Sequence, residues 1–379
     1  MTAALNLHLN RDQRDLYDRI RVLATETLAP IAAAGEPGRV NRPLVAALAQ
    51  HGLLARLFER DSVSAIELCL IREGLARGCT EAETAFALQG LGAYPIVQAG
   101  SEEVKAQWIP RVAAGTAVAA FALTEPDAGS DPAALSLHAT PDGDGGYVLN
   151  GEKLWISNAP EADVYTVFAR SEAATGARGL TAFAVAGDAP GLSGEPRDML
   201  AAHAIGSLTF DDVAVGPEHV LGQPGAGFRV AMGTLDLFRP SVGAFAIGMA
   251  HTALELASAY ALERETFGKP LKDHQAVAHR LAELHAHTEA ARLLVHQAAL
   301  AHDAGVADPA IAAMAKLLAT ETAQAAVDAA VQFHGAVALE QGHPLEHLYR
   351  DVRAPRIYEG ASEIQREIIA RSMFRAAAE

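Results

Sequence analysis

The chain has 379 residues, half of them hydrophobic, and a formal net charge of −16. A chain of this length exceeds the usual size of one domain, so we expect two or three domains. The negative charge argues against nucleic acid or an anionic membrane as the main partner, because both would repel the chain.

The two cysteines and the N-terminal segment indicate the cellular compartment in which we expect the protein. Cys69 and Cys79 fit neither a zinc motif nor a disulfide framework, so we expect buried free thiols in a reducing cytoplasm. The first residues contain aspartates where a leader would be basic and then apolar. Apolar runs such as Val242–Ala250 are far shorter than the roughly 20 residues of a membrane span, so no membrane anchor is expected.

Residues 1–117 predict an N-terminal helical domain, because apolar residues recur there at helical spacing. One amphipathic stripe starts at Leu16, and a second covers Val63–Gly78. Ser101 is the expected N-cap of a third helix.

Residues 118–222 predict a small antiparallel β domain. Asn150-Gly151 lies between two apolar segments and predicts a β-hairpin, since a type I′ turn needs positive φ at both central positions. Turn residues separate three further strand-like segments: Val164–Ala169, Leu180–Val185 and Ser207–Val213.

Residues 223–379 predict a C-terminal four-helix bundle, and the whole chain is then of the α+β class. Its helices are expected over Phe228–Glu265, over His274–Ala304, over Pro309–Phe333 and from about Ser362. Ser362 and Gln365 form an S-x-x-Q capping box, which places Glu359 on the short loop before the last helix. A solvated turn carboxylate is the ordinary interpretation of such a glutamate.

Short motifs carry the chemical information, although each also has an ordinary structural explanation. In ALTEPDAGSD, the segment Ala128-Gly129-Ser130 offers exposed N–H groups to a phosphate or a ring edge, or it is a simple β-turn. In EKLWISN, Trp155 and Ser157 share one strand face and fit a planar cofactor, although a strand tryptophan is more often core. In RETFGKPL, Arg264 and Phe267 lie near a helix end, where a solvated arginine is equally ordinary.

Other common sites are not predicted. No strand is followed by GxGxxG, so a Rossmann dinucleotide site is not expected. No serine sits in a G-x-S-x-G elbow. His343 and His347 have helical spacing for a metal but no nearby third ligand, so no metal site is expected.

The order of the motifs is more specific than any one of them. TEPDAGSD is followed by WISN about 30 residues later, by RETFGKPL about 110 residues after that, then by QFHG, and last by YEG before a helix. This series, together with the helical–β–helical layout, resembles the acyl-CoA dehydrogenase family over nearly the whole chain.

The resemblance implies non-covalent FAD bound without a Rossmann fold. It implies FAD contacts from the ten residues Leu123, Thr124, Ser130, Trp155, Ser157, Arg264, Phe267, Gln275, Gln332 and Gly335. The last five match positions that in part grip the neighbouring subunit's FAD, which implies a homo-oligomer, a tetramer or a dimer. It implies substrate contacts from Ser130, Phe238, Arg239, Tyr358 and Gly360.

The resemblance also implies the reaction. Glu359 matches the base that removes the α-proton of an acyl-CoA thioester, while flavin N5 accepts the β-hydride and a trans-2-enoyl-CoA forms. A buried carboxylate suits this role because burial raises its pKa towards neutrality. A sub-branch of the family has its base at the position of Phe238, and a phenyl ring cannot accept a proton. Electron-transferring flavoprotein is the implied electron acceptor.

The chain departs from the family pattern at Ala361, which stands where a threonine that helps to hold FAD is usual. Ala336 and Val337 replace part of a glycine-rich turn, and Phe238 makes the site more apolar and more crowded. We therefore expect a short, branched or cyclic acyl group. Two alternatives are an acyl-CoA oxidase of the same fold and a flavin-binding relative without turnover.

Overall fold

The computed structural model describes residue 6 and residues 8–58, 63–171 and 176–378. The chain divides into two compact units. The helical unit comprises Met1–Ala29, Ser64–Glu83 and Asp236–Glu379, and the sheet unit comprises Pro30–Val63 and Thr84–Leu235. The domain boundaries at residues 117 and 222 stay predictions.

The sheet unit contains eight paired strands among the described residues, in the order β6-β7-β3-β2-β4-β5-β8, with β1 beside β4. They are β1 (Ala119–Ala122), β2 (His138–Pro141), β3 (Tyr147–Ser157), β4 (Val164–Arg170), β5 (Leu180–Ala186), β6 (Leu192–Pro196), β7 (Ile205–Val215) and β8 (Val220–Leu221). Most neighbours are antiparallel as predicted, but β1 and β2 each pair with β4 in parallel. The strands β4 and β5 are buried almost throughout, which matches their unbroken apolar sequences.

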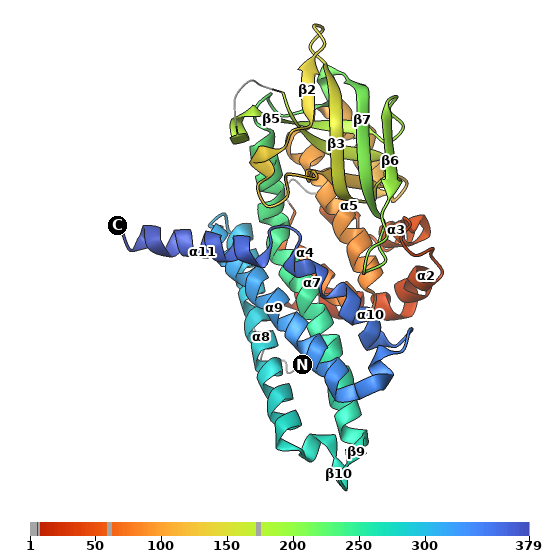
Figure 1. Ribbon diagram of the computed structural model, residues 1–379, viewed down its shortest axis with the longest axis vertical. Coiled ribbons are helices and arrows are strands. Elements are labelled where there is room, and N and C mark those ends of the chain that lie inside the picture. The colour runs from red at the N-terminus through yellow and green to blue at the C-terminus, as the bar shows by residue number, and fades with distance from the viewer. Residues whose placement is uncertain (1–5, 7, 59–62, 172–175, 379) are drawn as a thin grey trace. The chain divides into compact units, whose positions relative to one another are not determined.

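Helices cover one face of this sheet, as Figure 1 shows for α5. The helices concerned are α6 (Glu102–Ala113) and α5 (Thr80–Ala99), which starts in the helical unit. Helix α3 (Arg42–Gln50) also belongs to the sheet unit. Ile96 and Trp108 share a core with Phe168 of the sheet. A Cβ on Gly92 would lie 2.5 Å from the backbone nitrogen of Ala120, so α5 packs directly against β1. The cap predicted at Ser101 is present, since its hydroxyl accepts from the N–H of Val104 at 3.2 Å.

The helical unit is built from long helices. They are α1 (Arg11–Leu23), followed by a π-helix (Ala24–Leu28) and α2 (Ala29–Ala33), then α4 (Ala65–Ala76), α7 (Gly227–Glu263), α8 (Gln275–Asp303), α9 (Pro309–His334), α10 (Pro344–Asp351) and α11 (Ser362–Ala376). A small hairpin, β9 (Glu265–Thr266) and β10 (Lys269–Pro270), follows α7. A Cβ on Gly243 would lie 2.7 Å from Val295 and 3.3 Å from Ala319, so α7, α8 and α9 approach closely.

Helix α7 has the length and composition of a membrane-spanning helix, and 72% of its most apolar window is buried inside the fold. Core helices of folded proteins pass the same composition test. Its apolar character therefore has a sufficient explanation in packing.

The predicted Asn150-Gly151 hairpin is wrong. Strand β3 continues through both residues, and its register with β7 shifts between Leu149 and Gly151. The Asn150 side chain exchanges hydrogen bonds with Asp212 of β7, both at 2.9 Å, instead of forming a turn. Cross-strand pairing thus overrides the local turn preference.

Candidate active site

Glu359 lies on the turn between a 3₁₀ segment, Ala354–Arg356, and α11, as the sequence predicts. Its backbone is in the left-handed region at φ 50°, which is costly for a residue with a Cβ, and Gly360 follows at φ 92°. The turn is therefore held in a conformation that only its surroundings can maintain.

Two side chains hold the carbonyl oxygen of Gly360. Lys316 Nζ from α9 donates to it at 2.7 Å, and Gln365 Nε2 from α11 donates at 2.8 Å. Gln365 also donates to the carbonyl of Glu359 at 3.4 Å. Both donor side chains are completely buried, which limits competition from bulk water for these hydrogen bonds.

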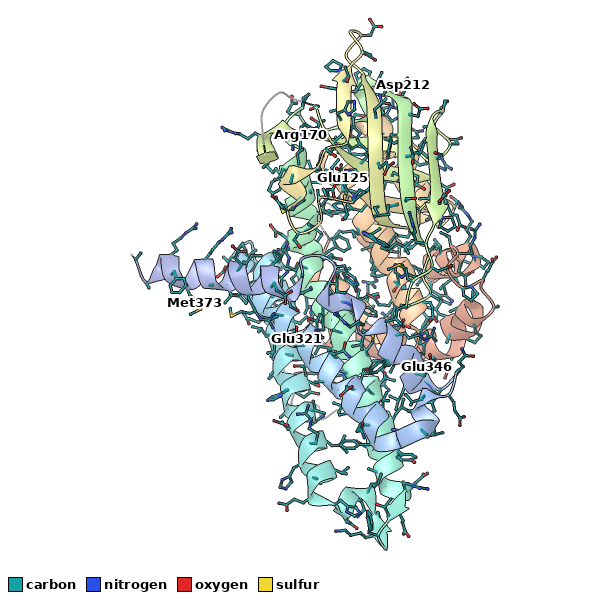
Figure 2. The ribbon with its side chains drawn as sticks, in the orientation of Figure 1. Glu125, Arg170, Asp212, Glu321, Glu346 and Met373 are labelled. Atoms are coloured by element: carbon teal, nitrogen blue, oxygen red, sulfur yellow. The ribbon has the colours of Figure 1, made fainter. Side chains whose placement is uncertain are left out.

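Glu321, labelled in Figure 2, ties the two ends of the turn to α9. It accepts from the Ser362 hydroxyl at 2.6 Å and pairs with Arg356 at 2.9 Å. Arg356 precedes Glu359 and Ser362 follows it, so α9 holds the turn from both sides.

The predicted capping box at Ser362 and Gln365 is wrong, although α11 does begin at Ser362. The N-cap is Ala361, which makes no side-chain hydrogen bond. Ser362 donates to Glu321, and Gln365 reaches back to the turn carbonyls. Stronger tertiary partners have replaced the local cap.

The carboxylate of Glu359 is partly desolvated. The residue is half-buried, its Oε2 atom is fully buried, and this atom has no hydrogen-bond partner among the described residues. Burial raises the pKa of Glu359, although the positive charges of Arg72, Lys316 and Arg239 oppose the shift. A partly buried carboxylate with one unpartnered oxygen and a raised pKa has the properties of a general base.

Arg72 of α4 is 2% exposed and is fixed from two sides. It pairs with Glu83 through Nε and donates from Nη1 to Ser241 Oγ at 2.7 Å. The Ser241 hydroxyl in turn donates to the carbonyl of Phe238 at 2.6 Å. This chain of contacts links Arg72 to the residue predicted to shape the substrate site.

The other predicted substrate residues lie on the same unit, apart from Ser130. Phe238 is 1% exposed, and Arg239 is 7% exposed and pairs with Asp236 at 3.0 Å. Arg239 Nε is buried and has no partner among the described residues, like Glu359 Oε2. Tyr358, next to Glu359, is 36% exposed. Two unpaired buried polar atoms and one exposed ring are thus available to a ligand.

The flavin-contact residues predicted in the sheet unit start after β1. The carbonyl of Leu123 accepts from Lys153 Nζ at 3.0 Å, and the carbonyl of Thr124 accepts from the N–H of Leu154. Glu125, labelled in Figure 2, pairs with Lys153 at 2.8 Å. This segment is therefore anchored to β3.

The loop after Glu125 only partly matches the prediction of free N–H groups. Ala128 is buried and its N–H donates to the carbonyl of Glu125 at 3.2 Å, so it belongs to the turn. Gly129 and Ser130 are exposed, and a Cβ added at Gly129 would meet no atom within 4 Å. The open part of the loop begins at Gly129.

Trp155 and Ser157 flank Ile156, which is buried in the core. Trp155 is 48% exposed and has φ 59°, at a register shift between β3 and β7. Ser157 is half-buried, with Oγ 3.4 Å from His203 Nε2. A half-exposed indole on strained backbone is not a core tryptophan, and its open surface fits a planar ring.

The five remaining predicted FAD residues lie in the helical unit, near helix ends. Arg264 and Phe267 follow α7, Gln275 begins α8, and Gln332 and Gly335 end α9. All five are exposed, and Phe267 is 98% exposed with φ 51°. Residues presented to the outside in this way fit contacts to another molecule rather than to their own core.

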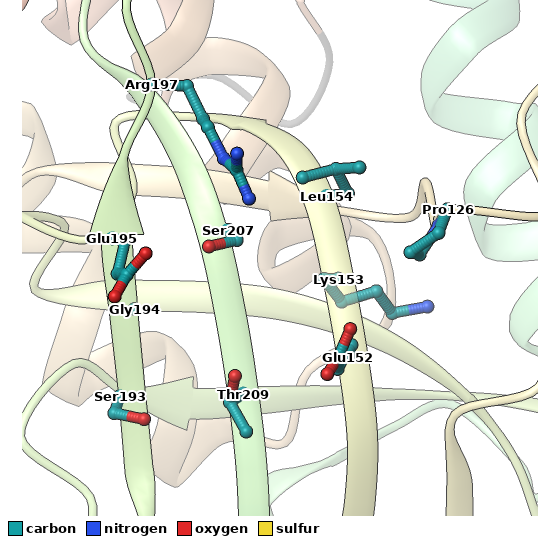
Figure 3. A pocket seen from close by; sticks show the side chains of 10 residues that line it. All are labelled: Pro126, Glu152, Lys153, Leu154, Ser193, Gly194, Glu195, Arg197, Ser207 and Thr209. Atoms are coloured by element: carbon teal, nitrogen blue, oxygen red, sulfur yellow. The ribbon is translucent and has the colours of Figure 1, made fainter.

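Figure 3 shows an open groove of about 450 Å³ on strands β3, β6 and β7 of the sheet unit. Its wall carries Glu152 and Glu195 as well as Arg197, so charges of both signs meet there. None of the predicted site residues lines it. We assign no chemistry to this groove.

Sequence reasoning missed Arg72, Lys316 and Gln365 as parts of the site. The signal for Lys316 is a cation on the apolar stripe of α9, where the residues at helical spacing, Ala313 and Ala319, are fully buried. Arg72 similarly lies in a helix that is buried on all sides. A charge in such a position requires a partner, and the sequence alone does not identify it.

The described residues thus combine helices with a β-sheet, an unpartnered buried oxygen of Glu359 on a strained turn, and an exposed Trp155 on β3. The family descriptions "Acyl-CoA dehydrogenase" N-terminal, middle and C-terminal domain match residues 10–116, 120–213 and 225–374. The chain belongs to the acyl-CoA dehydrogenase family, whose members are FAD-dependent.

Curated and solved relatives agree with this assignment. A cyclohexane-1-carbonyl-CoA dehydrogenase of Geobacter metallireducens is 34% identical over 97% of this chain and 99% of its own. The butyryl-CoA dehydrogenase structure from Megasphaera elsdenii has a TM-score of 0.90 at 33% identity, covering 97% of this chain and 99% of that one. A Mycobacterium smegmatis glutaryl-CoA dehydrogenase solved with FADH2 has a TM-score of 0.89 at 28% identity, covering 98% and 96%.

Proposed function

We propose that this protein converts an acyl-CoA thioester into the trans-2-enoyl-CoA and that Glu359 removes the α-proton. The observation that supports this role best is the buried Oε2 atom of Glu359, which has no partner among the described residues. A structural carboxylate would be paired, because an unpaired buried oxygen costs stability. A catalytic base must keep one oxygen free for the proton it receives.

The raised pKa of Glu359 matches the task. An α-proton of a thioester is only weakly acidic, so the base must bind a proton more tightly than an ordinary carboxylate does. Burial provides this affinity, and three cations keep the carboxylate charged when the pH is high enough. The backbone N–H of Glu359 is our candidate for holding the thioester oxygen, where negative charge develops as the proton leaves.

FAD, when bound, supplies the acceptor for the hydride that leaves the β-carbon. The residues that would hold it are Trp155 and Ser157 on β3 and the Leu123–Thr124 segment, with Ser130 near its phosphates. In this scheme, the exposed indole would lie against a flat ring, and the Leu123–Thr124 segment, which is anchored to β3, would hold the edge of that ring. Phe238, which is buried, and Tyr358, which precedes Glu359 in the sequence, are our candidates for excluding water from the site once ligands are bound.

We propose a short, branched or cyclic acyl group as substrate. Phe238 is fully buried at the position where a sub-branch of the family carries its base, and its ring occupies volume beside Arg239. The same crowding disfavours a long straight chain. Relatives named for cyclohexane-1-carbonyl-CoA and butyryl-CoA are compatible with this size range.

The assembly and the electron acceptor belong to the same proposal. Phe267 at 98% exposure and Leu262 at 60% lie around the end of α7, and solvent-exposed apolar side chains of this size favour contact with another subunit. We propose a homo-oligomer, a tetramer or dimer, with electron-transferring flavoprotein as acceptor. A cytoplasmic location is proposed from the sequence alone.

The test is an anaerobic titration of the yellow holoenzyme with butyryl-, isobutyryl-, cyclohexane-1-carbonyl- and palmitoyl-CoA. We expect bleaching of the flavin by one or more of the first three, with formation of the 2-enoyl product. Bleaching by palmitoyl-CoA alone would overturn the acyl-size proposal, and no bleaching by any acyl-CoA would overturn the activity. Rapid oxygen consumption during turnover would favour an oxidase instead.

A further inference from the structure

We propose that Lys316 is a positioning residue for the reaction: its buried ammonium group holds the Gly360 carbonyl, and its positive charge acts on the Glu359 carboxylate. This inference rests on the proposed function of Glu359 as the base. It adds a second role for the interior of the bundle, which is control of the base rather than packing.

The geometry places Lys316 directly behind the turn. Its Nζ lies 2.7 Å from the carbonyl oxygen of Gly360, one residue after Glu359, and the side chain is fully buried. The same oxygen accepts from Gln365 at 2.8 Å. A lysine that only filled space would be replaced at no cost by an apolar residue, so its charge calls for a separate explanation.

The charges around Lys316 come from several elements. Glu359 on the turn and Glu321 on α9 stabilise its charged form, as does Glu363 on α11, whereas Arg239 on α7 opposes it. Burial is the largest effect, and it lowers the pKa of Lys316 to about 8. At neutral pH the ammonium is therefore still charged, and its proton is held less tightly than that of an exposed lysine.

The positive charges that act on Glu359 come from three helices. Burial raises its pKa, and Arg72 on α4, Lys316 on α9 and Arg239 on α7 each lower it. Arg72 and Arg239 are already engaged by ion pairs with Glu83 and Asp236. Lys316 donates instead to a neutral carbonyl, so its charge is less compensated by a dedicated carboxylate than that of either arginine.

The test compares two variants that each remove one donor to the same oxygen. Lys316→Met removes a hydrogen bond and a charge, whereas Gln365→Leu removes a hydrogen bond alone. The first readout is the infrared band of the protonated Glu359 carboxyl in the resting holoenzyme, identified by its absence in Glu359→Gln, and followed against pH. The second is the pH dependence of anaerobic flavin bleaching.

In Lys316→Met we expect the titration of Glu359 to move to higher pH by about one unit, which lowers the bleaching rate below the midpoint about tenfold. In Gln365→Leu we expect a lower bleaching rate and an unchanged midpoint for the titration of Glu359. If Lys316→Met does not fold, Lys316→Gln keeps a donor without the charge and should show the same upward shift.

Two outcomes overturn the proposal: an unmoved midpoint in the neutral Lys316 variants, or an equal shift in Gln365→Leu. Failure of the underlying function has a different signature, because Glu359→Gln would then bleach at the wild-type rate. The infrared titration needs no substrate, so it tests Lys316 even if the acyl group is misassigned.

Discussion

Lys153 Nζ lies 2.8 Å from Glu125 Oε1, and the two side chains are 0% and 3% exposed. Glu125 also accepts from the N–H groups of Ser136 and Leu137 at 2.6 and 2.9 Å. The pair therefore joins β3, which carries Trp155, to the loop that begins at Leu123. Each charge is buried, so removal of one leaves the other without compensation.

Lys153→Met should lower the free energy of unfolding by about 3 kcal/mol or more, because Glu125 would stay buried without its cation. Loss of the loop anchor should also weaken FAD binding. Denaturant unfolding and flavin release on dilution measure the two effects. Lys105→Met is the matched control: its pair with Glu102 is exposed, so a change within about 0.5 kcal/mol is expected. Equal effects of Lys153→Met and Lys105→Met on the free energy of unfolding would contradict the stabilising role of the buried Lys153–Glu125 pair.

A second buried pair stabilises the helical unit. Arg292 Nε lies 2.7 Å from Glu73 Oε1, and His296 Nε2 lies 3.2 Å from Glu73 Oε2. Despite burial, these partners hold the pKa of Glu73 well below its usual range. We expect Arg292→Met to cost about 3–5 kcal/mol in urea unfolding, and Arg292→Met with Glu73→Leu to cost less.

The control for this pair is Arg280→Met on the same helix, whose partner Glu283 is exposed. It should change the free energy of unfolding by no more than about 1 kcal/mol. A double variant that is less stable than Arg292→Met alone would show that the pair does more than neutralise two buried charges.

Gly360→Ala should damage the turn in two ways. Its φ of 92° disfavours any side chain, and an added Cβ would lie 2.4 Å from Gln365 Nε2. Gly305→Ala has the unfavourable φ alone, at 71°, because no atom lies within 4 Å of the added Cβ. We expect about 1 kcal/mol of destabilisation for Gly305→Ala and clearly more for Gly360→Ala, with a lower bleaching rate only in the latter. Identical behaviour would mean that Gln365 does not constrain the turn.

Lys316 should make stability rise with pH in the alkaline range. Its pKa is about 8 in the fold against 10.5 in the unfolded chain. Between these values the unfolded chain binds the proton and the fold does not, so the free energy of unfolding increases with pH, in total by about 3 kcal/mol. Below pH 8 the fold carries the full cost of the buried ammonium.

The measurement is the difference in unfolding free energy between wild type and Lys316→Met from pH 7 to pH 10.5. Titrating groups that do not interact with Lys316 cancel in this difference. A difference in unfolding free energy that does not vary with pH would contradict the lowered pKa of the buried Lys316.

Much of the fold could be predicted from periodicity. The long helices α7, α8 and α9 begin and end within two residues of the predicted limits, because their alanine-rich sequences favour helix without tertiary help. The strands β4 and β5 were predictable from unbroken apolar runs between breakers. Helix α5 lies within the predicted helical residues 1–117, but its limits were not predicted, because it is apolar on most sides and shows no clear helical stripe.

Local sequence patterns predicted less of the site than of the fold. Glu359 could be placed on its turn, since Gly360 and the following helix mark it. The partners of the turn could not be predicted, because Lys316 lies 44 residues before Gly360 in the sequence and contacts it only through the packing of α9. The same holds for Gln365, whose local capping pattern loses to contacts that depend on the folded bundle.

The bleaching rate of Glu359→Gln under anaerobic conditions tests the central claim most directly. Glutamine keeps the size and the hydrogen-bonding oxygen but cannot accept the α-proton, so the yellow colour should stay and bleaching by an accepted acyl-CoA should fall about 10³-fold or more. Glu367→Gln on α11, whose side chain is 55% exposed, should bleach like the wild type. Wild-type bleaching by Glu359→Gln would contradict the assignment of Glu359 as the base.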